Sequence, residues 1–253
     1  MGGGLMQLVA YGAQDVYLTG NPQITFFKVV YRRHTNFSME AIEQTWNGSS
    51  LANGRCTATI SRNGDLVSRM YLEITTFGQA NVNNPSSAAI TSVEVEIGGQ
   101  RIDRHSGRWL ETYAELTEVN PNGCHGTAGQ LNGTQFQNMS GMGGVRQMPA
   151  GLVTPVFIPL QFWFCRNPGL ALPLIALQYH EVKIILNHNL TFALGATQNR
   201  LWADYIYLDT DERRRFAQVS HEYLIEQVQE QNMGQVNTVE LNFNHPVKEL
   251  ILT

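Results

Sequence analysis

The sequence predicts an all-β fold of about eight antiparallel strands, with one or two short helices and long loops. Short segments alternate between apolar and polar residues, as strands with one buried face do. Turn dipeptides such as Asn-Gly and Gly-Gly separate several of these segments. Hydrophobic residues make up 43% of the 253 residues, which is enough for a sizeable core. Many short strands joined by turns and a few long loops are typical of a sandwich or a jelly roll.

The first half of the chain contains three regions with strand patterns. Residues 36–46 form the first. Residues 57–74 predict a hairpin that turns at Asn63-Gly64, because this dipeptide readily adopts positive φ angles. Residues 92–103 alternate in the same way and turn at Gly98-Gly99. On the second arm of the first hairpin, an apolar face is expected opposite a polar face, with Leu66, Ser68, Met70, Leu72 and Ile74 on one and Arg69, Tyr71 and Glu73 on the other.

Two segments predict helices. Residues 107–119 place Leu110, Tyr113, Ala114 and Thr117 on one stripe. Residues 209–217 open with Asp209 and Glu212 at the spacing of a capping box. Between them, residues 119–151 are rich in Gly, Asn and Met without periodicity, which predicts a long surface loop.

The most apolar stretch of the chain, residues 157–186, is predicted to be core. Arg166, Asn167, Pro168, Gly169 and Pro173 interrupt it, so it does not supply the ~20 apolar residues of a membrane span. We interpret it as a strand at 156–164, a tight turn at 166–169, an apolar loop and a second strand at 177–186. The side chains expected to be buried here are Phe157, Ile158, Phe162, Val182, Ile184 and Leu186. Further strands are predicted at 201–208, 221–229 and 235–243.

Composition excludes several classes of protein. The net charge of −4 provides no bulk attraction to nucleic acid or to anionic lipid, although residues 31–34 and Arg213–Arg215 are local basic clusters. The three cysteines are few, odd in number and far apart, which argues against a disulfide framework. No basic residue precedes the first apolar segment, so a secretory signal is not expected.

No catalytic, cofactor-binding or metal-binding residue is predicted, and the chain is not expected to be an enzyme. Cys165 has no base indicated nearby, so a buried structural thiol is the better interpretation. His180 and Glu181 are expected on opposite faces of a strand, and His188 follows too far away to complete a metal site. Without a secretory signal, the five glycosylation sequons are interpreted as accidents of an Asn-rich chain; they begin at Asn36, Asn47, Asn132, Asn138 and Asn189.

Four long stretches resemble the major capsid proteins of large nucleocytoplasmic DNA viruses. They occur in the order of that family and extend along most of the chain: GAQDVYLTGNPQITFFKVVYRRHTNFSMEAIEQTWNG, IPLQFWFCRNPGLALPLIALQYHEVKI, WADYIYLDTDERRRFAQVSHEYLIEQVQ and FNHPVKEL. The resemblance implies an eight-stranded antiparallel jelly-roll sandwich that packs into trimeric, pseudo-hexagonal capsomers of an icosahedral shell. Family members carry two jelly rolls in series.

The resemblance also implies a domain plan. Residues 1–24 are expected to form an N-terminal arm, 25–243 the first jelly roll, and 244–253 a linker with the first strand of a truncated second jelly roll. The implied partners are two further copies in a homotrimer, neighbouring capsomers and minor capsid proteins, with no direct contact to nucleic acid and no membrane span. The implied location is the virion capsid, assembled in the host cell cytoplasm.

One alternative from another class is a jelly-roll module that binds carbohydrate. A cupin-like protein would show a cluster of histidines, which the sequence lacks. A lectin-like protein would present aromatic and acidic residues on one set of loops, whereas Trp163 and Trp202 are predicted within strands.

Overall fold

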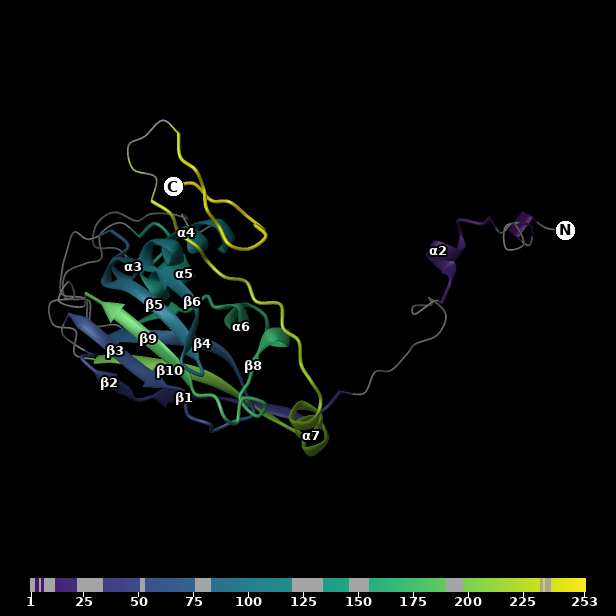
Figure 1. Cartoon of the computed structure of the whole chain (residues 1–253), viewed down its shortest axis with the longest axis horizontal. Helices are drawn as coiled ribbons and strands as arrows, with labels where there is room; N and C mark the ends of the chain where they lie inside the picture. Colours follow the sequence, from purple (N-terminus) through teal and green to yellow (C-terminus); the bar gives the residue numbers. More distant parts are fainter. Residues whose placement is uncertain are drawn as a thin grey trace. The chain divides into compact units, whose positions relative to one another are not determined.

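The structure is a computed structural model of the chain. It describes residues 3, 4, 6, 12–21, 34–50, 53–75, 83–119, 134–145, 155–189, 198–232, 234 and 238–253. The chain divides into two compact units, Met1–Thr35 and Asn36–Thr253 (Figure 1). The second unit is called the main body below.

The N-terminal unit contains the short helix α2 (Val16–Thr19). The Asp15 carboxylate accepts a hydrogen bond of 2.8 Å from the Gly12 amide, and the Gly20 amide donates to the Val16 carbonyl at 2.9 Å. These local bonds account for the single helical turn. The arm predicted at residues 1–24 stays a prediction.

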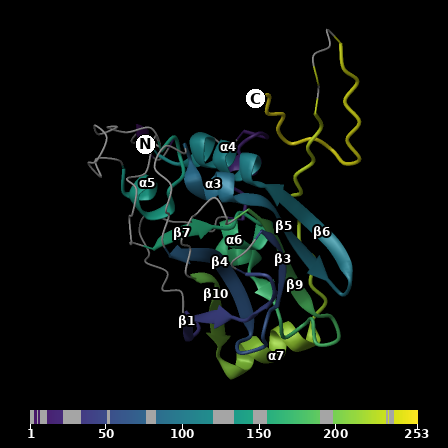
Figure 2. The same ribbon diagram turned by 90° about the vertical axis from the view of Figure 1, so that its left-hand side faces the viewer.

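The main body contains two antiparallel sheets. Sheet A has the order β1-β10-β4-β7, with β8 also paired to β4. Its strands are β1 (Phe37–Gln44), β4 (Leu66–Thr75), β7 (Val156–Pro159), β8 (Leu172–Pro173) and β10 (Gln198–Leu208). Sheet B has the order β2-β3-β9-β5-β6. Its strands are β2 (Trp46–Gly48), β3 (Gly54–Thr59), β5 (Ile90–Ile97), β6 (Gln100–Ser106) and β9 (Val182–His188). Figure 2 shows the strands of each sheet side by side.

Short helices flank the two sheets of the main body. They are α3 (Pro85–Ala89), α4 (Gly107–Thr117), α5 (Gln135–Ser140), α6 (Trp163–Arg166), the 3₁₀ turn η1 (Pro168–Leu170) and α7 (Thr210–Gln218). Helices α3, α4 and α5 gather at one end, and α7 lies at the other (Figures 1 and 2). Within the described residues, no helix is both long and apolar enough to cross a membrane.

One hydrophobic core joins the two sheets. Met70 and Leu72 of sheet A belong to the same buried cluster as Val95 and Ile184 of sheet B. Five of the six side chains predicted to be buried in the apolar stretch are buried: Ile158, Phe162, Val182, Ile184 and Leu186. The sixth, Phe157, is only half-buried, because it lies on the outer side of sheet A, where it contacts Tyr71.

The predicted turn at Asn63-Gly64 is wrong, whereas the one at Gly98-Gly99 is confirmed. Strands β3 and β4 belong to different sheets, so residues 60–65 cross from sheet B to sheet A. Neither Asn63 nor Gly64 has a positive φ. The chain passes close to β10 here, and a Cβ added at Gly64 would lie only 3.0 Å from the Tyr205 Cβ, which favours glycine at this position. Gly98 and Gly99 have φ values of 61° and 84° and join β5 to β6 as a hairpin.

A buried polar cluster holds the two places where the chain changes sheets. Gln44 ends β1 just before the chain enters β2, and Ser61 lies in the crossing from β3 to β4. The Gln44 side-chain oxygen accepts from the Ser61 amide at 2.9 Å. The Tyr205 hydroxyl of β10 donates to the Ser61 carbonyl at 2.5 Å. Both crossings are therefore fixed by hydrogen bonds inside the core.

A β-bulge in β4 changes the predicted facing of its first residues. The register to β10 shifts between Ala203 and Tyr205, which are paired to Met70 and Val67. Val67 therefore joins the main core, and Leu66 packs on the opposite side with Ile206. The prediction that Leu66 shares the face of Met70 is wrong because a bulge adds one residue to the alternation.

Four other predictions for the elements need correction. Residues 163–166 form helix α6, so the strand predicted from 156 ends at Pro159. Strand β9 begins at Val182, not at 177. Residues 221–229 form no strand, and neither do the described residues 238–243 of the last predicted strand. The predicted loop at 119–151 contains α5. The helices predicted from 107 and from 209 are confirmed as α4 and α7.

Candidate functional site

The cysteines that the structure describes are inert thiols. Cys56 is buried in β3, and Cys165 is half-buried in α6. Burial raises the pKa of each thiol to about 12. A thiol with that pKa is protonated at neutral pH and is a poor nucleophile. This agrees with the interpretation of Cys165 as a structural residue.

The histidines considered as metal ligands do not come together. His180 and Glu181 are exposed in the turn before β9, so their predicted placement on two faces of a strand is wrong. Glu181 pairs with Lys183 at 3.3 Å. His188 is buried, and its Nε2 lies 2.8 Å from the Ser49 carbonyl. Among the residues that the structure describes, no three His, Cys, Asp or Glu side chains are arranged to hold a metal.

The acidic and basic run at 209–215 serves helix α7. The Asp209 carboxylate caps the helix by accepting from the Thr210 amide at 2.8 Å. Glu212 pairs with Arg215 at 3.2 Å, and Arg213 reaches Asp65 at 3.0 Å. Capping and charge pairing thus explain this run, but the predicted capping box does not form, because Glu212 pairs with Arg215 instead.

The other residues singled out from the sequence are scattered. In the basic cluster at 31–34, only His34 is among the described residues, and it is exposed. Of the sequon asparagines, Asn36, Asn47 and Asn138 are exposed and Asn189 is half-buried. Asn132 lies outside the described residues.

The outer face of sheet A carries a row of aromatic side chains. Tyr71 of β4 and Trp202 of β10 are directly paired, with ring centroids 6.5 Å apart and planes at 14°. Phe157 of β7 meets Tyr71 edge-on at 6.0 Å. The Trp202 indole donates to Glu73 at 2.6 Å. All four side chains are half-exposed, so the row is accessible to a partner.

Charged groups surround this aromatic row. Arg69 is exposed beside Asp204, and Arg200 pairs with Glu43 at 3.7 Å. Burial raises the pKa of Asp204, and the nearby Arg69 opposes that rise. Burial, followed by the charges of Asp204 and Glu73, raises the pKa of Tyr71. The carboxylates and guanidinium groups therefore interact through a partly desolvated surface.

The outer face of sheet B is different in character. Glu94 of β5 lies 3.5 Å from Arg104 and 3.9 Å from Arg101, both in β6. The arginines are well exposed, with 55% and 61% of their side chains accessible. This face is ionic and solvated, whereas sheet A presents aromatic rings. The two outer faces are thus suited to different surroundings.

Residues 219–232 form a second surface, here called the strap. The strap leaves α7 and runs past α6 to α4 (Figure 1). Its Glu226 binds Arg166 of α6 at 3.0 Å and also contacts Lys248. The Arg166 guanidinium lies 4.7 Å from the centre of the Tyr113 ring. Hydrogen bonding from Lys248, with the charges of Lys248 and Arg166, lowers the pKa of Glu226.

The strap is also tied to strand β6. The Val228 amide donates to the Asp103 carboxylate at 3.1 Å. The Gln227 side chain donates to the Ile102 carbonyl, and the Ser106 hydroxyl donates to Glu230. These contacts use side chains rather than a backbone ladder, which is why the strand predicted at 221–229 does not form.

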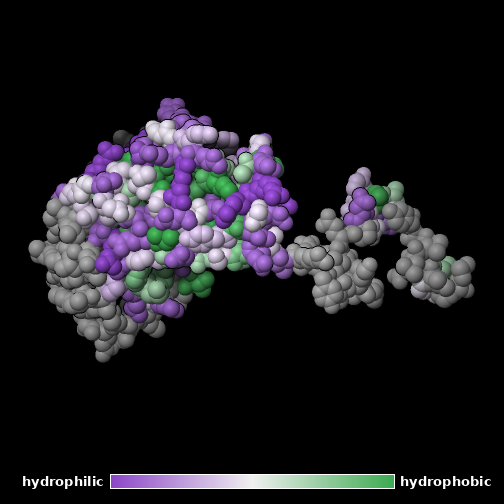
Figure 3. Space-filling model, turned by 90° about the horizontal axis from the view of Figure 1, so that it is seen from below, coloured by the Kyte–Doolittle hydropathy of each residue, from purple (hydrophilic) through white to green (hydrophobic). Residues whose placement is uncertain are grey.

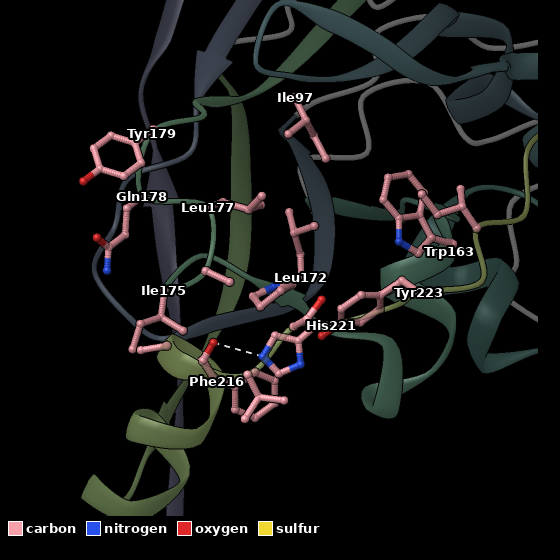
Figure 4. A pocket seen from close by; sticks show the side chains of 16 residues that line it. Ile97, Trp163, Leu172, Ile175, Leu177, Gln178, Tyr179, Phe216, His221 and Tyr223 are labelled. Atoms are coloured by element: carbon pink, nitrogen blue, oxygen red, sulfur yellow. Dashed lines mark hydrogen bonds between the residues drawn. The ribbon is translucent and has the colours of Figure 1, made fainter.

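A cavity of about 500 Å³ lies beside the strap (Figure 4). Its walls come from β8, from the turn after it, from the end of α7 and from the strap. The His221 ring stacks on Phe216 at 4.9 Å, and its Nε2 lies 2.9 Å from the Phe216 carbonyl. Leu172, Leu177 and Trp163 supply further apolar wall. This largely apolar lining suits an apolar group.

Exposed apolar residues extend beyond the cavity. Phe37 and Met39 of β1 are 66% and 53% exposed, and Leu224 of the strap is 79% exposed. The underside of the main body shows apolar residues dispersed among polar ones (Figure 3). The sequence pattern does not predict these surfaces, although the alternation of Arg69, Tyr71 and Glu73 places Tyr71 outside the core.

Comparison with known sequences identifies relatives along nearly the whole chain. The family described as the N-terminus of the major capsid protein matches residues 25–209. A major capsid protein of Pyramimonas orientalis virus is 57% identical over 99% of this chain and 65% of its own length. The major capsid protein of Paramecium bursaria Chlorella virus 1 is 46% identical over 99% of this chain and 60% of its own length. The chain thus spans somewhat less than two thirds of these relatives.

Solved structures give the same result. A quasi-atomic model of the PBCV-1 virus capsid superposes with a TM-score of 0.71 at 40% identity, covering 88% of this chain and 57% of that one. The PBCV-1 VP54 structure fitted into a reconstruction of the virophage Sputnik superposes with a TM-score of 0.68 at 41% identity, over 81% of this chain and 50% of that one. The two antiparallel sheets are thus arranged as in viral jelly-roll capsid proteins, and the chain belongs to the major capsid protein family of large nucleocytoplasmic DNA viruses.

Proposed function

We propose that this chain is a structural subunit of an icosahedral virus shell and that it has no enzymatic activity. The observation that supports this most strongly is the 57% identity to a major capsid protein over 99% of the chain. The inert thiols and the scattered histidines agree with a role that needs no reactive groups.

The main body supplies one jelly roll in this proposal. Eight strands longer than three residues would form it, four in each sheet, with the short β2 and β8 as additions: β1, β10, β4 and β7 face β3, β9, β5 and β6. The domain plan then has an arm at 1–24, the first jelly roll at 25–243, and the start of a second at 244–253. The family match over 25–209 supports the first of these boundaries.

The proposed assembly is a trimer of pseudo-hexagonal outline. Three chains with two jelly rolls each provide the six corners of such a capsomer, so three copies of the first jelly roll supply half of them. Neighbouring capsomers and minor capsid proteins would complete the shell in the host cell cytoplasm, without direct contact to nucleic acid. The exposed apolar residues of β1 and the strap provide surface for such contacts.

Light scattering behind size exclusion tests the proposal on two chains. One is the 253-residue chain, and the other is extended through a second jelly roll to the length of its relatives. We expect the extended chain to form three-chain particles that assemble further at higher concentration, and the short chain to fold without forming a closed trimer. An extended chain that folds but remains monomeric at every concentration would contradict the shell role.

A further inference from the structure

The outer face of sheet A presents four charges in an alternating square around its paired rings. This charge quartet consists of Arg69, Glu73, Arg200 and Asp204. Glu73 and Arg200 are directly paired between β4 and β10. Arg69 lies beside Asp204 on the same two strands, at the bulge. Each strand therefore carries one positive and one negative residue, and the signs are reversed on the neighbouring strand.

All four charges point away from the core. Met70 and Leu72 of β4 are 2% and 0% exposed and face inward, so the residues between and beside them face outward. Leu201 and Ala203 of β10 are buried in the same way. Between the charges lie the rings of Tyr71 and Trp202.

An alternating square of charges is complementary to itself. A twofold axis that lies in the face and runs along the strands places Glu73 opposite Arg200 of a second copy, and Arg69 opposite Asp204. An axis across the strands places Glu73 opposite Arg69, and Arg200 opposite Asp204. Within the charge quartet, either orientation brings opposite charges together and stacks the two aromatic pairs against each other, which is the self-complementarity that a twofold interface requires.

The composition of the face also fits a protein interface. Tyr, Trp, Phe and Arg are enriched in interface centres, and Lys is depleted. The aromatic row with Arg69 and Arg200 follows that pattern, and no lysine occurs among the outward residues of this region. Sheet B offers no such row, because the outward residues there form the ionic cluster around Glu94.

We propose that the outer face of sheet A binds the same face of a second copy of this chain through a twofold contact. This contact is separate from the threefold contacts of the proposed trimer, because a twofold interface pairs one face with itself. The face spans about 300 Å², given four strands about 4.8 Å apart and five residues about 3.3 Å each. Stable complexes bury roughly 800 Å² per partner, so a single contact is weak and reversible.

Two charge variants provide the test. The acidic-face variant combines Arg69→Glu with Arg200→Glu, and the basic-face variant combines Glu73→Arg with Asp204→Arg. Each variant opposes four like charges to four like charges when it meets itself. A mixture of the two opposes acidic to basic faces in both twofold orientations. The matched control is Arg101→Glu with Arg104→Glu, which makes the same change of charge on sheet B.

Sedimentation of the 253-residue chain at rising concentration, up to millimolar, measures the association. We expect weak dimerisation of the unmodified chain and of the sheet B control. Each charge variant alone should dimerise at least about tenfold more weakly, and the equimolar mixture should recover the association. Raising the salt concentration should weaken the mixture more than the unmodified chain.

A second measurement needs no substitution. Amide NMR shifts of the unmodified chain should change with concentration at Tyr71 and Trp202 and stay constant on sheet B at Glu94. An unmodified chain that is monomeric throughout, a variant that associates as tightly as the unmodified chain, or a mixture that fails to recover association overturns the proposal. None of these results bears on whether the extended chain forms trimers.

Discussion

At the scale of single residues, two tyrosines of the same strand have opposite surroundings. The Tyr205 hydroxyl is buried with Gln44 and Ser61, where the chain changes sheets. The Tyr207 hydroxyl is exposed and donates to Glu40 at 3.2 Å. Hydrogen bonds inside a core have no water to replace them, so the two hydroxyl groups differ in importance.

Removing the buried hydroxyl should destabilise the fold. The substitution Tyr205→Phe removes the short hydrogen bond to the Ser61 carbonyl, and the loss of such a buried bond costs about 1–3 kcal/mol. Urea unfolding followed by circular dichroism measures the change. Tyr207→Phe is the control, and its urea midpoint should equal that of the unmodified chain. Equal midpoints for both variants would show that the cluster does not hold the crossings.

At the scale of elements, Glu111 links α4 to the loop after α5. Its carboxylate accepts from the Gly143 and Gly144 amides at 2.9 and 2.8 Å, and from the Ser87 hydroxyl at 3.1 Å. Burial nevertheless raises the pKa of this carboxyl above 4.5. The folded state therefore holds the proton more tightly than the unfolded state.

This raised pKa predicts a dependence of stability on pH. The contribution of Glu111 is fully present below the pKa of the unfolded chain and is lost as pH rises through the higher pKa of the folded state. Glu111→Gln cannot ionise and keeps an oxygen for the two glycine amides. The melting temperature of the unmodified chain, relative to this variant, should fall as pH rises above about 4.5. A constant difference between pH 4 and 7 would contradict the assignment.

The strap is predicted to detach from α6 in acid. This pH dependence is opposite in sign to that of Glu111. The pKa of Glu226 is lowered, so its contribution is present at neutral pH and is lost as pH falls through the folded-state pKa. At neutral pH, Glu226→Gln should speed amide exchange in residues 226–230 by up to roughly fivefold, because exposed ion pairs contribute at most about 1 kcal/mol. Glu222→Gln, on the exposed side of the strap, should leave exchange unchanged.

The elements show which features a sequence can predict. The Gly98-Gly99 hairpin and helices α4 and α7 depend on neighbours within a few residues, and these predictions are confirmed. The turn predicted at Asn63-Gly64 fails because its two flanking strands join different sheets. Strand β3 pairs with β9 and strand β4 pairs with β10, and both partners lie more than a hundred residues away. The segment at 221–229 has a strand pattern, but it contacts β6 through side chains and forms no backbone ladder with it.

The candidate surfaces were harder to predict than the fold. Alternation placed Tyr71 and Glu73 outside the core, but nothing local places Trp202 beside them, because the two strands are paired only in the folded chain. The bulge that sets Arg69 beside Asp204 is invisible in the pattern of β4 for the same reason. These surfaces are therefore defined by the register between β4 and β10, which are far apart in the sequence.

At the scale of the whole molecule, the main body is expected to fold without the N-terminal arm. Residues 1–35 form a separate compact unit, and the family match begins at residue 25. Deleting residues 1–24 should leave the cooperative thermal unfolding of the main body unchanged, while weakening contacts between assembled capsomers. Loss of the cooperative transition on deletion would show that the arm belongs to the core.

The pairing of the first and last strands of sheet A has a mechanical consequence. Phe37 at the start of β1 is paired to Leu208 at the end of β10, so the chain enters and leaves this ladder at the same end. Tension applied through both ends would peel the strands apart one bridge at a time, starting at Phe37. A ladder loaded in this way yields at lower force than one that is sheared along its length. Single-molecule pulling from residues 36 and 209 should therefore give lower rupture forces than pulling from 44 and 209, where the same bridges are loaded together.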